Sequence, residues 1–444
     1  MPPPAKRMSG GSTPSAGVGE DWKTMQLYST LSRSIEPLKT RYPGRAALFV
    51  CGPTVYDYSH IGHARTYVVF DVFAKYLRWT GNEVFYLQNI TDVDDKILNR
   101  AKADGASPSS VARKFEVEYF RDMRALGIDG VSHYARATTH IPEIIGQIGR
   151  LFEKGAAYIT ETGVYFNIDT FPRNGELSRQ DNTANRVSRV SCSTKHNPED
   201  FALWKFGEYG EYTWDSPWGR GRPGWHIEDT AISEKYFGQQ YDIHGGGLDL
   251  IFPHHEAEIA QMESLEGKHP MVRYWMHTGF LTVAGEKMSK SLGNFITIRD
   301  ALARWERDVI RTFILLSHYR SPLQATDEGF QNAQKALAHI RAVATVDKGP
   351  DPAGRKAFTD AMDADLNTPA ALAAIQQLAA AGDLGALREF GEILGINFLR
   401  ETSAPLSVLE EIRAELRAKK QFEVADMIRA RMVAAGITIT DKPL

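Results

Sequence analysis

The strongest constraint on this chain is an apolar run that stops at a Gly-Pro pair. A predicted helix without a polar face follows it. Residues 46–51, AALFVC, predict a buried parallel strand that ends at Gly52-Pro53. Residues 64–79 are apolar on nearly every face, which predicts a buried helix. A second strand is predicted over 83–90. This order is a βαβ unit, so the sequence predicts an α/β fold with a Rossmann-like parallel sheet.

Two histidines stand where that helix should begin. His60 and His63 are three residues apart, so both rings should lie on one helix face and reach the same anion. Helix N-termini attract phosphates because their amides are unpaired and their dipole end is positive. Gly62 lies between the two and would let a flat base approach the backbone. The preceding strand and turn favour a nucleotide site over two ordinary surface histidines.

Two lysines lie in a polar stretch closed by glycines. Lys287 and Lys290 fall between Gly285 and Gly293. Ammonium groups on a mobile loop can close over a triphosphate and match the charge that grows in a transition state. An ordinary basic loop is the alternative when this stretch is taken alone. Together with the histidine pair, it predicts a site for a nucleoside triphosphate.

A third cluster has the spacing of metal ligands. Residues 253–258 read PHHEAE, and His254 and Glu258 lie on one face if this stretch is helical. A capped surface helix is the alternative. Cys51 ends the first predicted strand, at the edge where open α/β sheets bind ligands. A lone buried cysteine is usually just a small apolar residue, but this position argues for more.

Three consecutive glycines follow a further predicted strand. Residues 245–247 are expected to form a turn that lets the backbone touch a ligand, and Asp249 could accept hydrogen bonds from ribose hydroxyls. A simple tight turn is equally compatible with the pattern. Trp225 and His226 could line a small pocket or pack in the core.

Length and composition limit the class of protein. At 444 residues the chain should hold two to four structural units. The net charge of −3 gives no global basic field, so a nucleic-acid partner would need a local patch. The two cysteines, Cys51 and Cys192, exclude a disulfide framework and fit a reducing cytosol. We expect no membrane-spanning segment, since no apolar run reaches about 18 residues.

Changes in composition and periodicity along the chain predict several structural units. From about 137 to 216, short β-like segments alternate with polar stretches, which predicts an insertion that splits a nucleotide-binding sheet. Beyond Arg311 the pattern predicts helices. The predicted units are a disordered tail (1–22), the first half of a catalytic domain (23–136), a connective insertion (137–216), the second half (217–268), a connecting domain with the lysine stretch (269–320), a helical bundle (321–400) and C-terminal helices (401–444).

These motifs resemble those of the class I aminoacyl-tRNA synthetases, and within them the cysteinyl-tRNA synthetase family. HIGH at 60–63 and KMSKS at 287–291 match the two class signatures. The cysteine-specific resemblance rests on FVCGPTVYD (49–57), NITD (89–92), DFALWK (200–205), PGWHIE (223–228), DIHGGG (242–247) and the stretch 252–258. It implies activation of L-cysteine by ATP with Mg²⁺, then transfer of the cysteinyl group to tRNA(Cys). We expect a cytoplasmic monomer whose C-terminal α-helical region binds the tRNA, including its anticodon region.

The resemblance also implies site residues. Its catalytic residues map to His60, His63, Lys287 and Lys290, with Gly62, Gly245, Gly247 and Asp249 added for ATP. Substrate binding maps to Thr54, Trp225 and His244, and one Zn²⁺ per chain to Cys51, His254 and Glu258. In the family this zinc binds the substrate thiolate. An apolar pocket separates near-isosteres such as cysteine and serine by only about 1–3 kcal/mol, whereas a metal that binds sulfur discriminates better.

The chain departs from the family pattern at one ligand. After Trp225-His226-Ile227-Glu228 the family has a second cysteine, and this chain has Asp229. Aspartate can bind zinc and carries the same formal charge as a cysteine thiolate, so we expect Asp229 to be the fourth ligand. With oxygen in place of sulfur, the site would be chemically harder than that of the family. The competing interpretation is a metal-free or weakened site, with Cys192 and His196 as remote substitutes.

Three other functions compete with this interpretation. A ligase that passes cysteinyl-adenylate to an amino sugar would lack the long helical region after Arg311, which here ends in two basic amphipathic helices over 406–437. A non-catalytic RNA-binding paralogue would lack the signature histidines or lysines. A metallohydrolase would explain the cluster at 253–258 but neither phosphate motif.

Overall fold

The computed structural model describes residues 25–179, 194–283, 286–287 and 295–399, together with 412–413, 415–417, 421 and 424–429. The predicted tail, Cys192, Lys290 and most of the predicted C-terminal helices lie outside these residues. For 286–287 the description covers the backbone.

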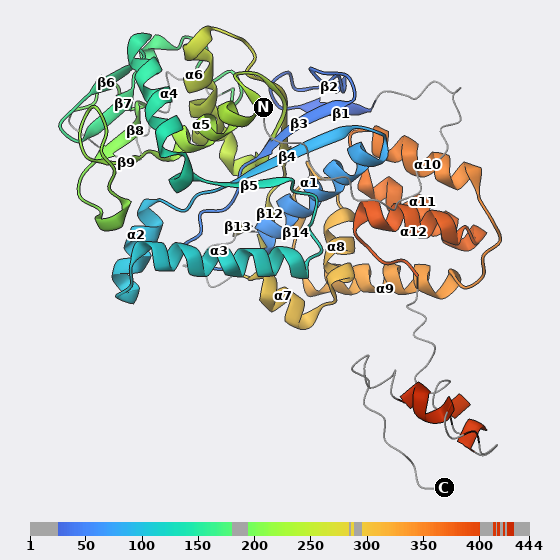
Figure 1. The fold of residues 1–444 in the computed structure, drawn as a ribbon. Helices are drawn as coiled ribbons and strands as arrows, with labels where there is room; N and C mark the ends of the chain where they lie inside the picture. Colours follow the sequence, from blue (N-terminus) through green and yellow to red (C-terminus); the bar gives the residue numbers. More distant parts are fainter. Residues whose placement is uncertain are drawn as a thin grey trace.

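Five parallel strands form the central sheet, which confirms the predicted α/β fold (Figure 1). In spatial order they are β11 (Val272–Thr278), β10 (Tyr241–Gly247), β3 (Arg45–Val50), β4 (Glu83–Ile90) and β5 (His133–Arg136). The chain moves from β3 through β4 to β5, then returns to the other side of β3 for β10 and β11. The strand order therefore reverses between β3 and β10, and open α/β sheets bind ligands at such a reversal.

Helix α1 (Ile61–Trp79) connects β3 to β4 and is buried along nearly its whole length. It begins three residues before the predicted start because His60 caps it. One side of α1 packs on the sheet, and the other contacts α8 (Arg307–Leu315) and α12 (Leu384–Leu394). Partners on both sides explain why the sequence of this helix has no polar face.

A second, antiparallel sheet lies between β5 and β10 in the chain, and its last strand lies beyond residue 216, where the predicted insertion ends. Its order is β6 (Ala157–Ile159), β7 (Gly163–Phe166), β8 (Phe201–Phe206) and β9 (Gly221–Pro223). Helices α4 (Ile141–Glu153), α5 (Trp225–Phe237) and α6 (Glu256–Glu266) lie beside it (Figure 1). Helix α5 leads directly from this sheet back to the central one.

Beyond β11 the described chain forms a small sheet, whose last strand follows two helices, and then further helices. Strands β12 (Leu281–Val283), β13 (Glu286–Lys287) and β14 (Leu323–Gln324) pair in the order β13-β12-β14. Helices α9 to α12 lie together on the far side of α1 from the insertion sheet (Figure 1). The remaining elements are β1 (Gln26–Ser29), β2 (Ser34–Pro37), α2 (Asp95–Asp104), α3 (Pro108–Ala125), α7 (Ile298–Arg304), α9 (Asp327–Val343), α10 (Pro352–Asp363) and α11 (Thr368–Ala381).

A buried ion pair joins the helical region to the central sheet. Arg311 of α8 and Asp71 of α1 are both fully buried, with Nη2 2.8 Å from Oδ2. The same guanidinium donates to the carbonyls of Leu394 and Leu126. Removing either charge would leave the other buried and unpaired, which typically costs about 3–5 kcal/mol. Among the helices of the described residues, none is long and apolar enough to cross a membrane.

Candidate active site and metal-binding group

His60 and His63 form a reciprocal cap at the start of α1. The Nδ1 atom of His60 accepts from the amides of Gly62 (3.1 Å) and His63 (3.3 Å), and Nδ1 of His63 accepts from the His60 amide (3.2 Å). The two rings stack with centroids 3.8 Å apart. The expectation of unpaired amides at this helix end is therefore wrong, because the histidines themselves satisfy the amides of Gly62 and His63.

This cap determines where the imidazole protons lie. In a neutral imidazole one nitrogen accepts and the other carries the proton, so a ring that accepts at Nδ1 is protonated at Nε2. Burial, with the nearby charge of Lys96 adding to it, lowers the pKa of His63 to about 4. His63 is therefore neutral at pH 7 and offers an Nε2–H donor rather than a positive charge.

Described residues flank the predicted lysine stretch, and those that follow it lie beside these histidines. On one side, Lys287 of β13 pairs with Thr282 of β12. On the other side, residues 295–298 lie against the start of α1: the Ile61 amide donates to Ile296 (3.1 Å), and the ring of Phe295 meets His60 edge-on at 5.2 Å. Lys290, Gly285 and Gly293 lie outside the described residues, as does the side chain of Lys287.

Cys51, Asp229, His254 and Glu258 converge at the carboxyl end of β3. Each is buried, and one donor atom from each lies within 4.8 Å of the others. Nε2 of His254 is 3.0 Å from Asp229 Oδ2 and 3.2 Å from Glu258 Oε1. The prediction of a shared helix face holds only in part, because His254 lies in a π-helical turn (Ile251–His255) directly before α6.

Asp229 is oriented by a second side chain. Its Oδ1 atom accepts from Asn89 Nδ2 at 2.6 Å, which leaves Oδ2 directed at His254. Asn89 lies at the end of β4, so two neighbouring strands and α5 all contribute to this group. Partners of this kind fix the orientation of metal ligands.

The group is suited to a bound cation. Neither carboxylate oxygen of the fully buried Glu258 has a hydrogen-bond partner among the described residues. Burial, followed by the charges of Glu258 and Asp229, raises the pKa of the Cys51 thiol. Burial and Asp229 likewise raise the pKa of Glu258. A divalent cation would offset this crowding of acidic groups, and one thiolate, one imidazole and two carboxylates are donors that zinc accepts.

Two further histidines contact Cys51. His244 Nε2 and His255 Nε2 lie 3.3 and 3.2 Å from its Sγ atom. With Cys51 and Glu258 they form a second group of closely spaced donors. His244, which was expected at the substrate, is buried, and its ring centroid lies 4.4 Å from that of Trp275. Its Nδ1 atom forms a hydrogen bond with the hydroxyl of Tyr241. His255 was not among the site residues predicted from the sequence, although its place beside His254 was the available signal.

The three glycines at 245–247 are not a turn, because they belong to β10 and pair with β11. A Cβ atom on Gly245 would lie 2.2 Å from the ring of Phe70, so this glycine permits the close packing of α1 on the sheet. A Cβ on Gly247 would lie 2.6 Å from Oδ1 of Asp249. Packing within the protein therefore accounts for Gly245 without a ligand.

Trp225 and Thr54 border the group. Trp225, the first residue of α5, stacks on His254 with ring centroids 4.1 Å apart. It also lines a cavity of about 650 Å³ between α5 and the insertion sheet. Thr54 bridges to Thr91 just beyond β3. His196, proposed as a remote metal ligand, instead stacks on Tyr158 at 3.8 Å.

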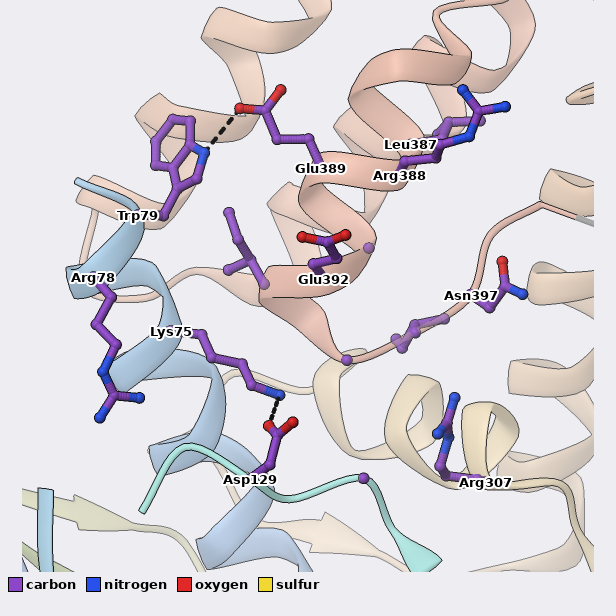
Figure 2. A pocket seen from close by; sticks show the side chains of 15 residues that line it. Lys75, Arg78, Trp79, Asp129, Arg307, Leu387, Arg388, Glu389, Glu392 and Asn397 are labelled. Atoms are coloured by element: carbon purple, nitrogen blue, oxygen red, sulfur yellow. Dashed lines mark hydrogen bonds and ion pairs between the residues drawn. The ribbon is translucent and has the colours of Figure 1, made fainter. Parts of the chain in front are cut away.

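A larger cavity of about 750 Å³ lies at the other end of α1 (Figure 2). Its charged side chains are of both signs and several are already paired: Lys75 contacts Asp129 at 2.6 Å, and Trp79 donates to Glu389 at 2.9 Å. The 19 residues of α1 span roughly 28 Å at 1.5 Å per residue, so this cavity is far from the histidine cap. It is not part of the candidate active site.

Comparisons with known proteins agree on one family. A family model described as the class I (C) tRNA synthetase catalytic domain matches residues 37–335. The cysteine–tRNA ligase of Heliobacterium modesticaldum is 43% identical over 472 residues, covering 95% of this chain and 98% of that protein. The same ligase of Thermococcus kodakarensis is 45% identical over 465 residues, covering 94% and 98%.

Two solved structures support the fold alone. A Mycobacterium tuberculosis methionyl-tRNA synthetase in complex with methionyl-adenylate has a TM-score of 0.58 at 17% identity, over 79% of this chain and 84% of that one. An Agrobacterium radiobacter LeuRS in a ternary complex has a TM-score of 0.60 at 12% identity, over 80% and 84%.

Proposed function

Because the chain belongs to the cysteinyl-tRNA synthetase family, whose members are class I aminoacyl-tRNA ligases, we propose how its residues divide the work of charging tRNA with cysteine. The reaction takes place at the strand-order reversal between β3 and β10. On one side of this point the histidine cap of α1 and the lysine stretch bind ATP. On the other side the group around Cys51 binds the cysteine side chain.

In the first step a carboxylate oxygen of L-cysteine attacks the α-phosphorus of ATP carried with Mg²⁺. The bond from that phosphorus to the β-phosphate bridge breaks, so cysteinyl-adenylate and pyrophosphate form. The rings of His60 and His63, which both accept at Nδ1, donate from Nε2 to phosphate oxygens, which the cap geometry supports. Lys287 and Lys290 supply the positive charge, and Gly62 and Asp249 contact the nucleoside. A single well-placed donor of this kind is worth about 10²–10³ in rate.

In the second step a hydroxyl of the 3′-terminal adenosine of tRNA(Cys) attacks the carbonyl carbon of the adenylate. An ester bond to the tRNA forms, the bond between that carbon and the phosphate oxygen breaks to release AMP, and the hydroxyl proton leaves to the phosphate or to solvent. Both steps act on the same carboxyl group, the first through its oxygen and the second at its carbon, so the amino acid must stay held throughout. Thr54 and Trp225 border this position and are proposed to hold the substrate backbone.

Cys51, Asp229, His254 and Glu258 would hold one Zn²⁺. When bound, the ion would supply a coordination position for the substrate sulfur and favour its thiolate form. Serine offers a hydroxyl in place of that thiolate, so it would be rejected without an editing step. The observation that carries this proposal is the buried Glu258 carboxylate, which has no hydrogen-bond partner among the described residues and faces three other donor groups.

Metal content and substrate choice test the proposal together. We expect about one zinc per chain in purified protein, and pyrophosphate exchange that depends on cysteine and not on serine. Charging of tRNA(Cys) is expected, while a glucosamine-containing acceptor should stay unmodified. An active enzyme without zinc would refute the metal-based selection, and absence of exchange with cysteine would refute the activation step. We also propose that the protein works as a monomer in the cytoplasm.

A further inference from the structure

Arg65 of α1 is a buried arginine without an acidic partner among the described residues. Its side chain is 1% exposed, and no carboxylate of the described residues forms an ion pair with it. Its Nε atom also has no hydrogen-bond partner there. Burial lowers its pKa to about 10, so the guanidinium is still charged at pH 7. A buried charge without a counter-ion is costly, which calls for a specific reason for its presence.

All the hydrogen bonds of Arg65 within the described residues go to backbone carbonyls. Nη1 donates to Phe280 (2.8 Å), and Nη2 donates to His318 and Tyr319 (both 3.3 Å). Nη2 also donates to the carbonyl of Ser321. These carbonyls come from two segments that run side by side, so one side chain holds both.

The two segments form the base of the small sheet that carries Lys287. Phe280 directly precedes β12, and its carbonyl also accepts from Leu323 of β14 (2.9 Å). The amide of Gly279 donates to the carbonyl of Tyr319 (2.8 Å). A Cβ on Gly279 would lie 2.5 Å from the Ser321 carbonyl, so the two segments are as close as a backbone allows. Strand β12 then pairs with β13 through Thr282 and Lys287.

Arg65 is also close in sequence to the histidine cap. It lies two residues after His63, on the same helix, so its position is coupled to that of the capping rings. One residue further, Thr66 Oγ1 lies 2.8 Å from Thr278 Oγ1 at the end of β11, just before Gly279. The contacts of Arg65 and Thr66 therefore join the helix that carries the histidines to the strand pair that carries Lys287.

We propose that Arg65 is a positioning residue for cysteine activation: its guanidinium fixes β12, and through it the backbone of Lys287, relative to His60 and His63. This inference rests on the proposed role of Lys287 in the first step. An ammonium group cannot replace the guanidinium, because it cannot span carbonyls from two segments with a planar fork of donors.

The expected effect is on catalysis rather than on substrate binding. A misplacement of about 1 Å at a reacting centre can cost about 10²-fold in rate. We therefore expect Arg65→Lys and Arg65→Gln to lower kcat of cysteine-dependent pyrophosphate exchange about 100-fold. KM for ATP and for cysteine should change less than about 3-fold, the pattern of an interaction used mainly in the transition state. Transfer to tRNA from preformed cysteinyl-adenylate should keep its rate.

Arg311→Lys is the matched control. Arg311 is equally buried and also binds backbone carbonyls, but it pairs with Asp71 in the middle of α1 and has no hydrogen bond to the small sheet among the described residues. This variant should lose thermal stability while its kcat stays within about 2-fold of the parent at 25 °C. An equal loss of kcat in both lysine variants would reduce Arg65 to a general stability role and overturn the proposal.

A double substitution tests the route through Lys287. If Arg65 acts by placing Lys287, Arg65→Lys should have almost no further effect in a Lys287→Ala background, and the two losses should be far from additive. Additive losses, or normal exchange by Arg65→Lys alone, would overturn the inference while leaving the proposed function intact. Normal exchange by Lys287→Ala alone would instead refute the proposed role of the lysine, and this inference with it.

Discussion

Replacing Asp229 by alanine removes one donor from the metal-binding group. The Asp229 side chain is 1% exposed, and its Oδ2 atom lies 3.0 Å from His254 Nε2. The change also leaves Asn89 Nδ2 without the acceptor that it contacts at 2.6 Å. Cys51, His254 and Glu258 would remain as three donors, so zinc binding should be weakened rather than abolished.

The size of the effect follows from the kind of contact that is lost. Loss of a partner that only orients a ligand costs about 10–100-fold in metal affinity. Asp229 is proposed as a ligand itself, so its loss should cost at least about 100-fold, or about 2.7 kcal/mol. Asn89→Ala, which removes the orienting group but keeps the ligand, should lie within the 10–100-fold range.

Zinc affinity is measured by competition with a chromophoric chelator, in parallel with metal content and pyrophosphate exchange. Glu256→Gln is the matched control, because Glu256 is a buried carboxylate on α6, the helix of Glu258, and accepts from the amides of Gly175 and Ser178 instead. This control should lower thermal stability and keep one zinc per chain. Asp229→Cys, which introduces the residue of the family pattern, should bind zinc at least as tightly as the parent.

Zinc affinity of Asp229→Ala within about 3-fold of the parent would refute Asp229 as a ligand. The second donor group, which replaces Asp229 and His254 by His244 and His255, would then be the better candidate. His255→Ala distinguishes the two groups. It should keep zinc if the ion lies at Asp229 and lose it if the ion lies at His244.

Three further outcomes are expected. Glu258→Gln should abolish stoichiometric zinc but make the chelator-treated protein at least as thermally stable as the metal-free parent, because it removes a buried carboxylate without a hydrogen-bond partner among the described residues. A lower melting temperature than that of the metal-free parent would contradict this. His63 has a pKa of about 4 in the folded protein against 6.5 as its ordinary value, so the unfolded chain binds more protons between these values and stability should fall as the pH drops from about 6.5 to about 4. His63→Gln should reduce that slope in urea titrations at several pH values, and an unchanged slope would argue against the shift. Arg311→Met should lower the free energy of unfolding by about 3–5 kcal/mol by leaving Asp71 buried and unpaired, and a loss below about 1 kcal/mol in urea melts would contradict the proposed role of this pair.

Much of the central sheet could be predicted because its signals are local. The apolar run before Gly52 became β3, and the second strand over 83–90 was confirmed as β4. The helix between them was confirmed, although it starts at Ile61 because a histidine acts as the cap. Periodicity could not show this start, since histidine is not a usual capping residue.

The glycines show where local pattern reading fails. A run of three glycines is usually a turn, yet residues 245–247 are extended in β10. The reason is the ring of Phe70, which occupies the space of a Cβ on Gly245. That ring is 175 positions earlier in the chain, so no window of neighbouring residues contains it.

By itself, the sequence determined the βαβ unit, the placement of the two histidines at a helix start and the presence of metal-ligand residue types. Only the tertiary structure decided that Cys51, Asp229, His254 and Glu258 share one buried volume, that His255 joins Cys51, and that Arg65 binds carbonyls of the two segments that precede β12 and β14. Local structure follows from the side chains of adjacent residues, whereas these contacts depend on how strands far apart in the chain are ordered in the sheet.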